Sequence, residues 1–126
     1  MRGVVYDAGV LVAADKNDRR VWAEHRVRLE LGLIPLVPAA VVAQVSRSPR
    51  QAQLRRLLVG CDVLPMDEAA AHRAGLLLGK TRTADVIDAA VVDVAATHKA
   101  TILTSDPTDI HRLVTALGAR VDVFAI

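Results

Sequence analysis

The chain has 126 residues, of which 52% are hydrophobic and 24% charged, and its formal net charge is +2. A single cysteine, Cys61, excludes an internal disulfide and a multi-cysteine zinc site. No apolar run approaches the ~20 residues that span a bilayer, and no secretory signal pattern opens the chain. We therefore expect one cytoplasmic domain over residues 1–126, without membrane contact.

Short apolar runs alternate with segments of helical periodicity along the whole chain. The expected strands are residues 3–6, 33–37, 61–64, 101–103 and 121–125. The expected helices are residues 8–15, 18–31, 39–46, 50–59, 67–78, 85–98 and 106–117. Strands that alternate with helices indicate a three-layer α/β/α sandwich with a mostly parallel central sheet.

Acidic residues stand at the ends of several of these elements. Asp7 follows the first apolar run, Asp85 and Asp88 open a later helix, and Asp106 follows the run at 101–103. The carboxyl ends of parallel strands share one crevice, so these carboxylates are expected to converge. Carboxylates around one point repel each other unless a hard divalent cation such as Mg²⁺ or Mn²⁺ neutralises them. The pattern predicts a metal-dependent acidic site.

Each acid also has a simpler interpretation as a helix cap, because an Asp oxygen accepts hydrogen bonds from the free N–H groups of a first turn. Asp88 fits that interpretation least, since its neighbours are apolar and a buried carboxylate needs a partner. A cation shared with Asp7 and Asp106 would supply one. Asp93 and the four histidines are expected at the surface or at helix ends.

Three segments resemble the PIN-domain nucleases, in particular the VapC-like toxins of bacterial toxin–antitoxin pairs. Residues 4–11 (VVYDAGVL) resemble the opening strand and first acid of that family. Residues 85–90 (DVIDAA) and 104–109 (TSDPTD) resemble its third and fourth acidic motifs, at the expected spacing. The resemblance extends over essentially the whole chain.

The resemblance implies an RNA endonuclease that uses Mg²⁺ or Mn²⁺, forms a homodimer and is held inactive by a VapB-like antitoxin. Carried over by position, the metal ligands and catalytic acids would be Asp7, Asp88 and Asp106. Asp85 would lie beside them as a further ligand. Thr104 and Ser105 would orient these carboxylates by hydrogen bonds, as groups around metal ligands commonly do, and Asp109 would lie beside them.

One position departs from the family pattern. The second acid, usually a Glu in the helix after the second strand, falls on Gln44. An amide can offer one oxygen to a metal but carries no charge, so cation affinity should fall unless Asp85 supplies the missing charge. Gln44 therefore leaves open a second interpretation, a PIN fold that binds RNA or a protein partner without cutting.

Arginine side chains are the expected contacts to RNA phosphates, with Arg47, Arg50 and Arg82 as the candidates near the cleft. The chain has only one Trp, one Tyr and one Phe, so it has little capacity to stack bases. A less favoured alternative is a phospho-receiver domain, which has a similar length and an acidic Mg²⁺ pocket. That class needs paired acids after the first strand, where this chain has Asp7 alone.

Overall fold

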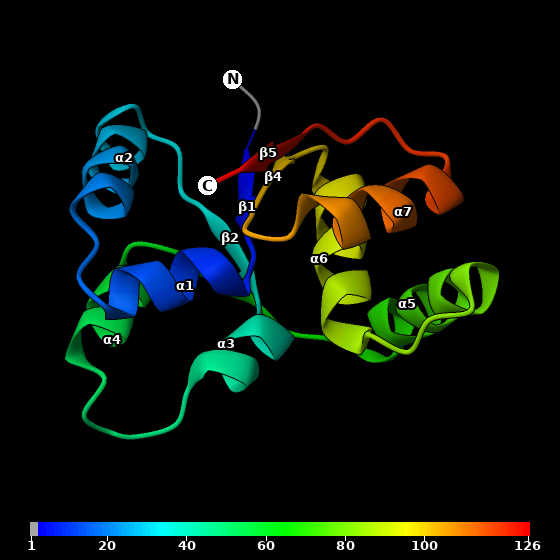
Figure 1. The fold of residues 1–126 in the computed structure, drawn as a ribbon, viewed down its shortest axis with the longest axis horizontal. Helices are drawn as coiled ribbons and strands as arrows, with labels where there is room; N and C mark the ends of the chain where they lie inside the picture. The colour runs from blue at the N-terminus through cyan, green and yellow to red at the C-terminus, as the bar shows by residue number, and fades with distance from the viewer. Residues whose placement is uncertain (1–2) are drawn as a thin grey trace.

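The computed structural model describes residues 3–126, and strands alternate with helices throughout this range (Figure 1). The strands are β1 (Val4–Tyr6), β2 (Leu36–Pro38), β3 (Asp62–Leu64), β4 (Thr101–Thr104) and β5 (Val123–Ala125). The helices are α1 (Ala8–Asp15), α2 (Arg19–Glu30), α3 (Ala39–Val45), α4 (Ala52–Val59), α5 (Glu68–Thr81), α6 (Val86–His98) and α7 (Pro107–Leu117). The expected domain of residues 1–126 includes Met1 and Arg2, which lie outside the described residues.

The strands form a parallel sheet with the order β3-β2-β1-β4-β5. β1 lies at its centre, where Val5 pairs with Leu36 of β2 on one side and with Ile102 of β4 on the other. From β1 the chain adds β2 and β3 on one side of the sheet and then β4 and β5 on the other, so the strand order reverses beside β1. Ligand crevices form at such switch points in open α/β sheets. Phospho-receiver domains have the order 2-1-3-4-5, so the strand order shows that this alternative is wrong.

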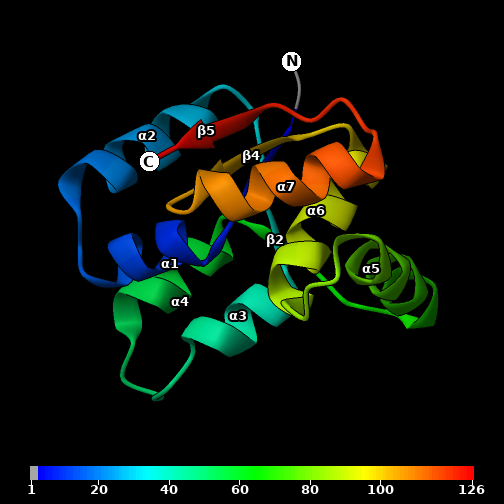
Figure 2. The same cartoon turned by 45° about the vertical axis from the view of Figure 1, so that its right-hand side comes forward.

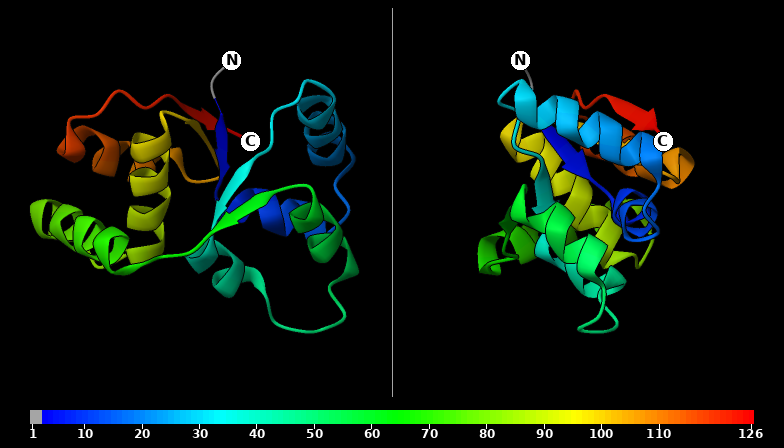
Figure 3. Two further views of the ribbon diagram at one scale, coloured as in Figure 1. Left: turned by 180° about the vertical axis from the view of Figure 1, so that it is seen from behind. Right: turned by 90° about the vertical axis from the view of Figure 1, so that its left-hand side faces the viewer.

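Helices cover both faces of the sheet. α1, α2 and α4 lie on one side, and α5, α6 and α7 lie on the other (Figure 1, and from behind in Figure 3). α7 runs alongside β4 and β5 on its side of the sheet (Figure 2). The expected three-layer sandwich with a parallel central sheet is confirmed. None of the helices in residues 3–126 is long and apolar enough to cross a membrane.

Aliphatic side chains fill the interior, as the scarcity of aromatic residues requires. Val5, Tyr6, Val37 and Ile102 of the central strands are fully buried. α6 has the sequence VIDAAVVDVAATH, and Val91 and Val92 are among the side chains that bury it against the sheet. Burial of a Val or Leu side chain contributes about 1.5–3 kcal/mol, so this core is the main source of stability.

Two element boundaries differ most from the sequence prediction, and the others differ less. α5 continues through Gly79 to Thr81, and its end is set by Arg82, whose backbone is left-handed with φ 55°. A lone glycine weakens a helix without ending it, which explains the longer α5. β2 begins at Leu36 instead of residue 33. Pro35 stands before that start, and proline has no N–H group to donate to a neighbouring strand.

Asp93 is buried, so its predicted surface position is wrong. It is 9% exposed and accepts two hydrogen bonds from Arg73, at 2.8 Å from Nε and 3.2 Å from a terminal nitrogen. This bidentate pair joins α5 to α6. The two hydrogen bonds from Arg73 offset the free-energy cost of burying the charged Asp93 carboxylate among apolar side chains.

His25 is also buried, at 3% exposure, against the expectation for the histidines. Its Nδ1 lies 2.8 Å from the Tyr6 hydroxyl, and that hydroxyl accepts a hydrogen bond from Arg28 at 3.1 Å. In the Tyr6–His25 pair the donor is the hydroxyl or the Nδ1–H, according to the tautomer of His25. Burial lowers the pKa of His25, with the Arg28 charge adding to the effect. These hydrogen bonds attach α2 to the central strand.

Candidate active site at the carboxyl edge of the sheet

Asp7 is held at the end of β1 by three hydrogen bonds. Its side chain is 5% exposed, and Oδ1 accepts from the backbone N–H of Ala8 at 2.7 Å. Oδ2 accepts from the Thr104 hydroxyl at 2.6 Å, and the Asp7 backbone N–H donates to the Leu103 carbonyl at 3.0 Å. Asp7 also occupies the N-cap position of α1. The carboxylate is therefore fixed in direction before any ligand arrives.

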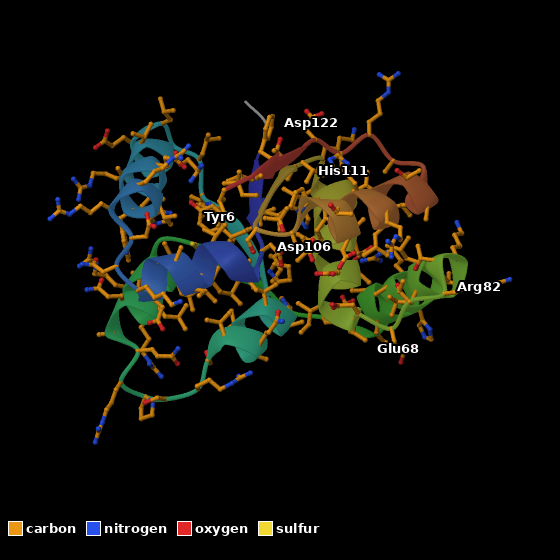
Figure 4. All side chains as sticks on the ribbon, viewed as in Figure 1. Tyr6, Glu68, Arg82, Asp106, His111 and Asp122 are labelled. Carbon is orange, nitrogen blue, oxygen red and sulfur yellow. The ribbon has the colours of Figure 1, made fainter. Side chains whose placement is uncertain are left out.

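Thr104 connects two of the predicted acids. Its hydroxyl donates to Asp7 and accepts from the backbone N–H of Asp106 at 3.0 Å, and the residue is fully buried at the end of β4. Asp106 stands at the start of α7, yet its side chain makes no capping hydrogen bond. Asp106 is exposed and lies near the middle of the view in Figure 4, where β4 passes into α7. Capping therefore does not explain Asp106.

Asp85 and Asp88 bring two further carboxylates to this edge from α6. Oδ1 of Asp85 caps the helix by accepting from the Asp88 backbone N–H at 2.9 Å. Asp88 is half-buried one turn into the helix. Its pKa is raised from the ordinary 3.8 to about 7, most of all by burial, and then by the charges of Asp85, Asp7 and Asp106 and a hydrogen bond with Asp85.

The charges of Asp85, Asp7 and Asp106 all act on Asp88, so four carboxylates lie near one another at this edge of the sheet. Three elements meet there: the ends of β1 and β4 and the first turn of α6. No cation among residues 3–126 forms a salt bridge with any of the four. Repulsion of this kind is what a hard divalent cation with oxygen ligands removes. The donor set thus fits Mg²⁺ or Mn²⁺, although no three Asp, Glu, His or Cys side chains of the described residues are already arranged around a cation position.

The remaining predicted site residues are less closely tied to this cluster. Gln44 is exposed near the end of α3, and its side chain makes no hydrogen bond within residues 3–126. Ser105 directly precedes Asp106, Asp109 follows it by three residues, and both are exposed. The structure therefore brings Asp7, Asp85, Asp88 and Asp106 together, and Thr104 is the residue that links them.

The three predicted RNA-contacting arginines are all exposed, at different places. Arg47 lies after α3 and donates to the carbonyls of Ala43 and Ser46, and Arg50 lies in the same connection to α4. Arg82 lies at the far end of α5, well away from Asp106 (Figure 4). Sequence reasoning missed Lys16, which lines an open groove of about 520 Å³ that begins beside the acids at Ser105.

Comparisons with known proteins agree with this geometry. Residues 4–114 match the PIN domain family. The fold is similar to that of VapBC2 from Rickettsia felis bound to a promoter DNA fragment, with TM-score 0.72, 14% identity and 98% of each chain covered. It is similar to a toxin–antitoxin complex from Klebsiella pneumoniae, with TM-score 0.66, 15% identity and 85% of this chain and 89% of the other covered.

A third similar structure is FitAcB from Neisseria gonorrhoeae, with TM-score 0.62, 17% identity and 96% of each chain covered. At these identities the solved structures show a shared fold. Comparison with curated proteins gives no match. The family match spans β1 through most of α7 and includes all four converging acids. The chain therefore belongs to the PIN domain family.

Proposed function

We propose that the protein is a metal-dependent endoribonuclease that hydrolyses RNA phosphodiester bonds with Mg²⁺ or Mn²⁺. The observation that carries this proposal is the convergence of Asp7, Asp85, Asp88 and Asp106, whose charges add to the effect of burial in raising the pKa of Asp88 to about 7. PIN domains are a nuclease family, which supports a hydrolase acting on nucleic acid. The all-carboxylate donor set has the charge and the oxygen chemistry that such a reaction needs.

The residues of the chain have distinct roles in this proposal. Asp7, Asp88 and Asp106 would hold the cation, with Asp85 beside them. When bound, a divalent cation lowers the pKa of water, polarises a phosphoryl oxygen and stabilises the leaving oxygen. Thr104 keeps one oxygen of Asp7 directed toward the site. Asp88 must lose its proton before it can act as a ligand, so site assembly depends on pH near its raised pKa.

RNA would reach the acids along a groove beside α1. Its lining residues are Ala8, Gly9, Val12, Ala13, Lys16, Asp18 and Ser105. One oxygen of the Asp18 carboxylate caps α2 by accepting from the Val21 N–H at 3.1 Å. Lys16 forms no salt bridge within residues 3–126, so its ammonium group is free for an RNA phosphate. Arg47 and Arg50 remain candidates for further phosphate contacts.

We further propose that the protein is the toxin of a toxin–antitoxin pair, is cytoplasmic, forms a homodimer and is inhibited by a VapB-like antitoxin. The similar structures from Rickettsia felis and Klebsiella pneumoniae, a VapBC protein and a toxin–antitoxin complex, support this proposal. Large apolar side chains are exposed on and after α2, namely Val27, Leu31 and Ile34, at 51%, 55% and 59%. Such surfaces are typical of places that a protein partner covers.

The test is cleavage of a mixed pool of structured RNA by the purified, antitoxin-free protein with Mn²⁺, Mg²⁺ or EDTA. Asp88→Asn should abolish cutting, whereas Asp62→Asn, an exposed acid at the start of β3, should leave it unchanged. Cutting that persists in EDTA, or in Asp88→Asn, would refute the proposed site.

A second candidate function is a PIN fold that binds RNA or a partner without cutting, which the uncharged Gln44 favours. Assays of the wild type and of Gln44→Glu separate the active nuclease from the module that only binds. If the wild type is an active nuclease, Gln44→Glu should alter the Mn²⁺ concentration needed for RNA cleavage. In a module that only binds, the wild-type protein retains RNA in a shift assay and cuts none of it at any Mn²⁺ concentration.

A further inference from the structure

Gly9 and Ser105 lie against each other where the two segments that carry Asp7 and Asp106 meet. Gly9 is in the first turn of α1, two residues after Asp7, and Ser105 directly precedes Asp106. A Cβ atom placed on Gly9 would lie 2.2 Å from Oγ, 2.6 Å from Cβ and 3.2 Å from the backbone nitrogen of Ser105. Real Cβ atoms essentially never come within 3.0 Å of another heavy atom.

The Ser105 hydroxyl could rotate away from such an atom, but its Cβ and nitrogen are fixed to the backbone. Carbon atoms in contact lie about 3.5–4.0 Å apart, so any larger residue at position 9 would push the two segments apart by roughly 1 Å. The Thr104–Asp7 hydrogen bond, at 2.6 Å, spans the same gap. An added ångström would lengthen it beyond the range of a hydrogen bond.

We propose that Gly9 is a positioning residue, whose missing side chain sets the separation of Asp7 and Asp106 and thereby the affinity of the site for a divalent cation. This inference rests on the proposed function. Backbone conformation does not explain the glycine, because Gly9 is helical and its φ is not positive. Alanine favours a helix more than glycine does, so helix stability alone would select the larger residue.

The test compares Gly9→Ala with Gly75→Ala, which introduces the same methyl group into α5 where nothing lies within 4 Å. Mn²⁺ affinity, measured by calorimetry, should fall at least about tenfold in Gly9→Ala and stay unchanged in Gly75→Ala. Thermal unfolding in EDTA should show that both variants are folded. Wild-type affinity in Gly9→Ala would overturn the inference.

Two further changes identify the atoms responsible. Ser105→Gly removes both side-chain atoms that a Cβ on residue 9 would meet, so Gly9→Ala combined with Ser105→Gly should regain wild-type Mn²⁺ affinity. Gly9→Ala combined with Ser105→Ala keeps the contact at 2.6 Å between the two Cβ atoms, so it should restore no Mn²⁺ affinity. Equal rescue by both, or rescue by neither, would overturn the inference.

The proposed function can fail separately. A wild-type protein that binds no Mn²⁺ refutes the metal-dependent nuclease. Metal-free crystal structures of wild type and Gly9→Ala then still decide the positioning role, because it requires a larger separation of Asp7 and Asp106 in the variant. An unchanged separation would overturn it.

Discussion

The acid cluster should destabilise the metal-free protein, and Asp88→Asn should relieve that cost. The pKa of Asp88 is about 7 in the folded protein and 3.8 ordinarily. As pH rises, the unfolded chain loses this proton first, so the folded state binds more protons between these two values. Stability from this group is fully present below about pH 4, falls as pH rises and is lost by about pH 7, with no further change above. Asparagine does not titrate, so the variant escapes this loss.

The size of the effect follows from the pKa difference. At about 1.4 kcal/mol for each tenfold change, the shift from 3.8 to about 7 sets an upper limit of about 4 kcal/mol. Asp88 is only half-buried and solvent screens its neighbours, so we expect about 1–2 kcal/mol. For a domain of this size, that gain in stability raises the melting temperature by roughly 4–8 °C.

Thermal unfolding in EDTA at about pH 4 and about pH 8 measures the prediction. Asp88→Asn should melt near the wild type at the lower pH and above it at the higher pH. Glu68→Gln is the matched control, because Glu68 is also an acid in a first helical turn but lies far from Asp106 (Figure 4). The reasoning is refuted if Asp88→Asn is no more stable than wild type at the higher pH, or if its gain is the same at both.

Three other changes probe separate parts of the structure. Thr104→Val removes the hydroxyl that joins Asp7 to the Asp106 backbone, so Mn²⁺ affinity should fall roughly 10–100-fold by calorimetry while the fold survives; an unchanged affinity would contradict this role. Lys16→Gln should weaken RNA binding and reduce the slope of log affinity against log salt by about 0.7. Lys80→Gln on α5 is the control, and equal slopes in the two variants would count against a groove contact. Tyr6→Phe leaves a buried ring nitrogen of His25 without its hydrogen-bond partner and should cost about 1–3 kcal/mol in urea unfolding, at constant pH.

The element order and the gathering of the acids at one edge of the sheet could be predicted because both depend on local pattern. The apolar runs before Asp7 and Asp106 mark buried parallel strands, and residues directly after such strands must lie at one edge of the sheet. Asp88 was recognisable because a cap does not explain it. Its raised pKa agrees with that reasoning.

The pairs that tie one element to another could not be predicted in this way. Arg73 and Asp93 are 20 residues apart, and Tyr6 and His25 are 19 apart. Each meets its partner only because two elements pack at a particular rotation, which helical periodicity does not specify. The close approach of Gly9 to Ser105 has the same origin. A polar residue inside an apolar helix, such as Asp93 in α6, was the one signal that a buried partner existed.

The hydrogen bond between Thr104 and Asp7 joins residues 97 positions apart, and β1 acquires its neighbour β4 only from residues 101–104. Chains fold from the amino end as the ribosome delivers them, and contacts between such distant residues form late. A nascent chain that has emerged only as far as α6 therefore has Asp7, Asp85 and Asp88 but neither the threonine nor the strand that gathers them. The acids can come together only when the last fifth of the polypeptide has been made, so under the proposed function an incomplete translation product lacks the assembled site.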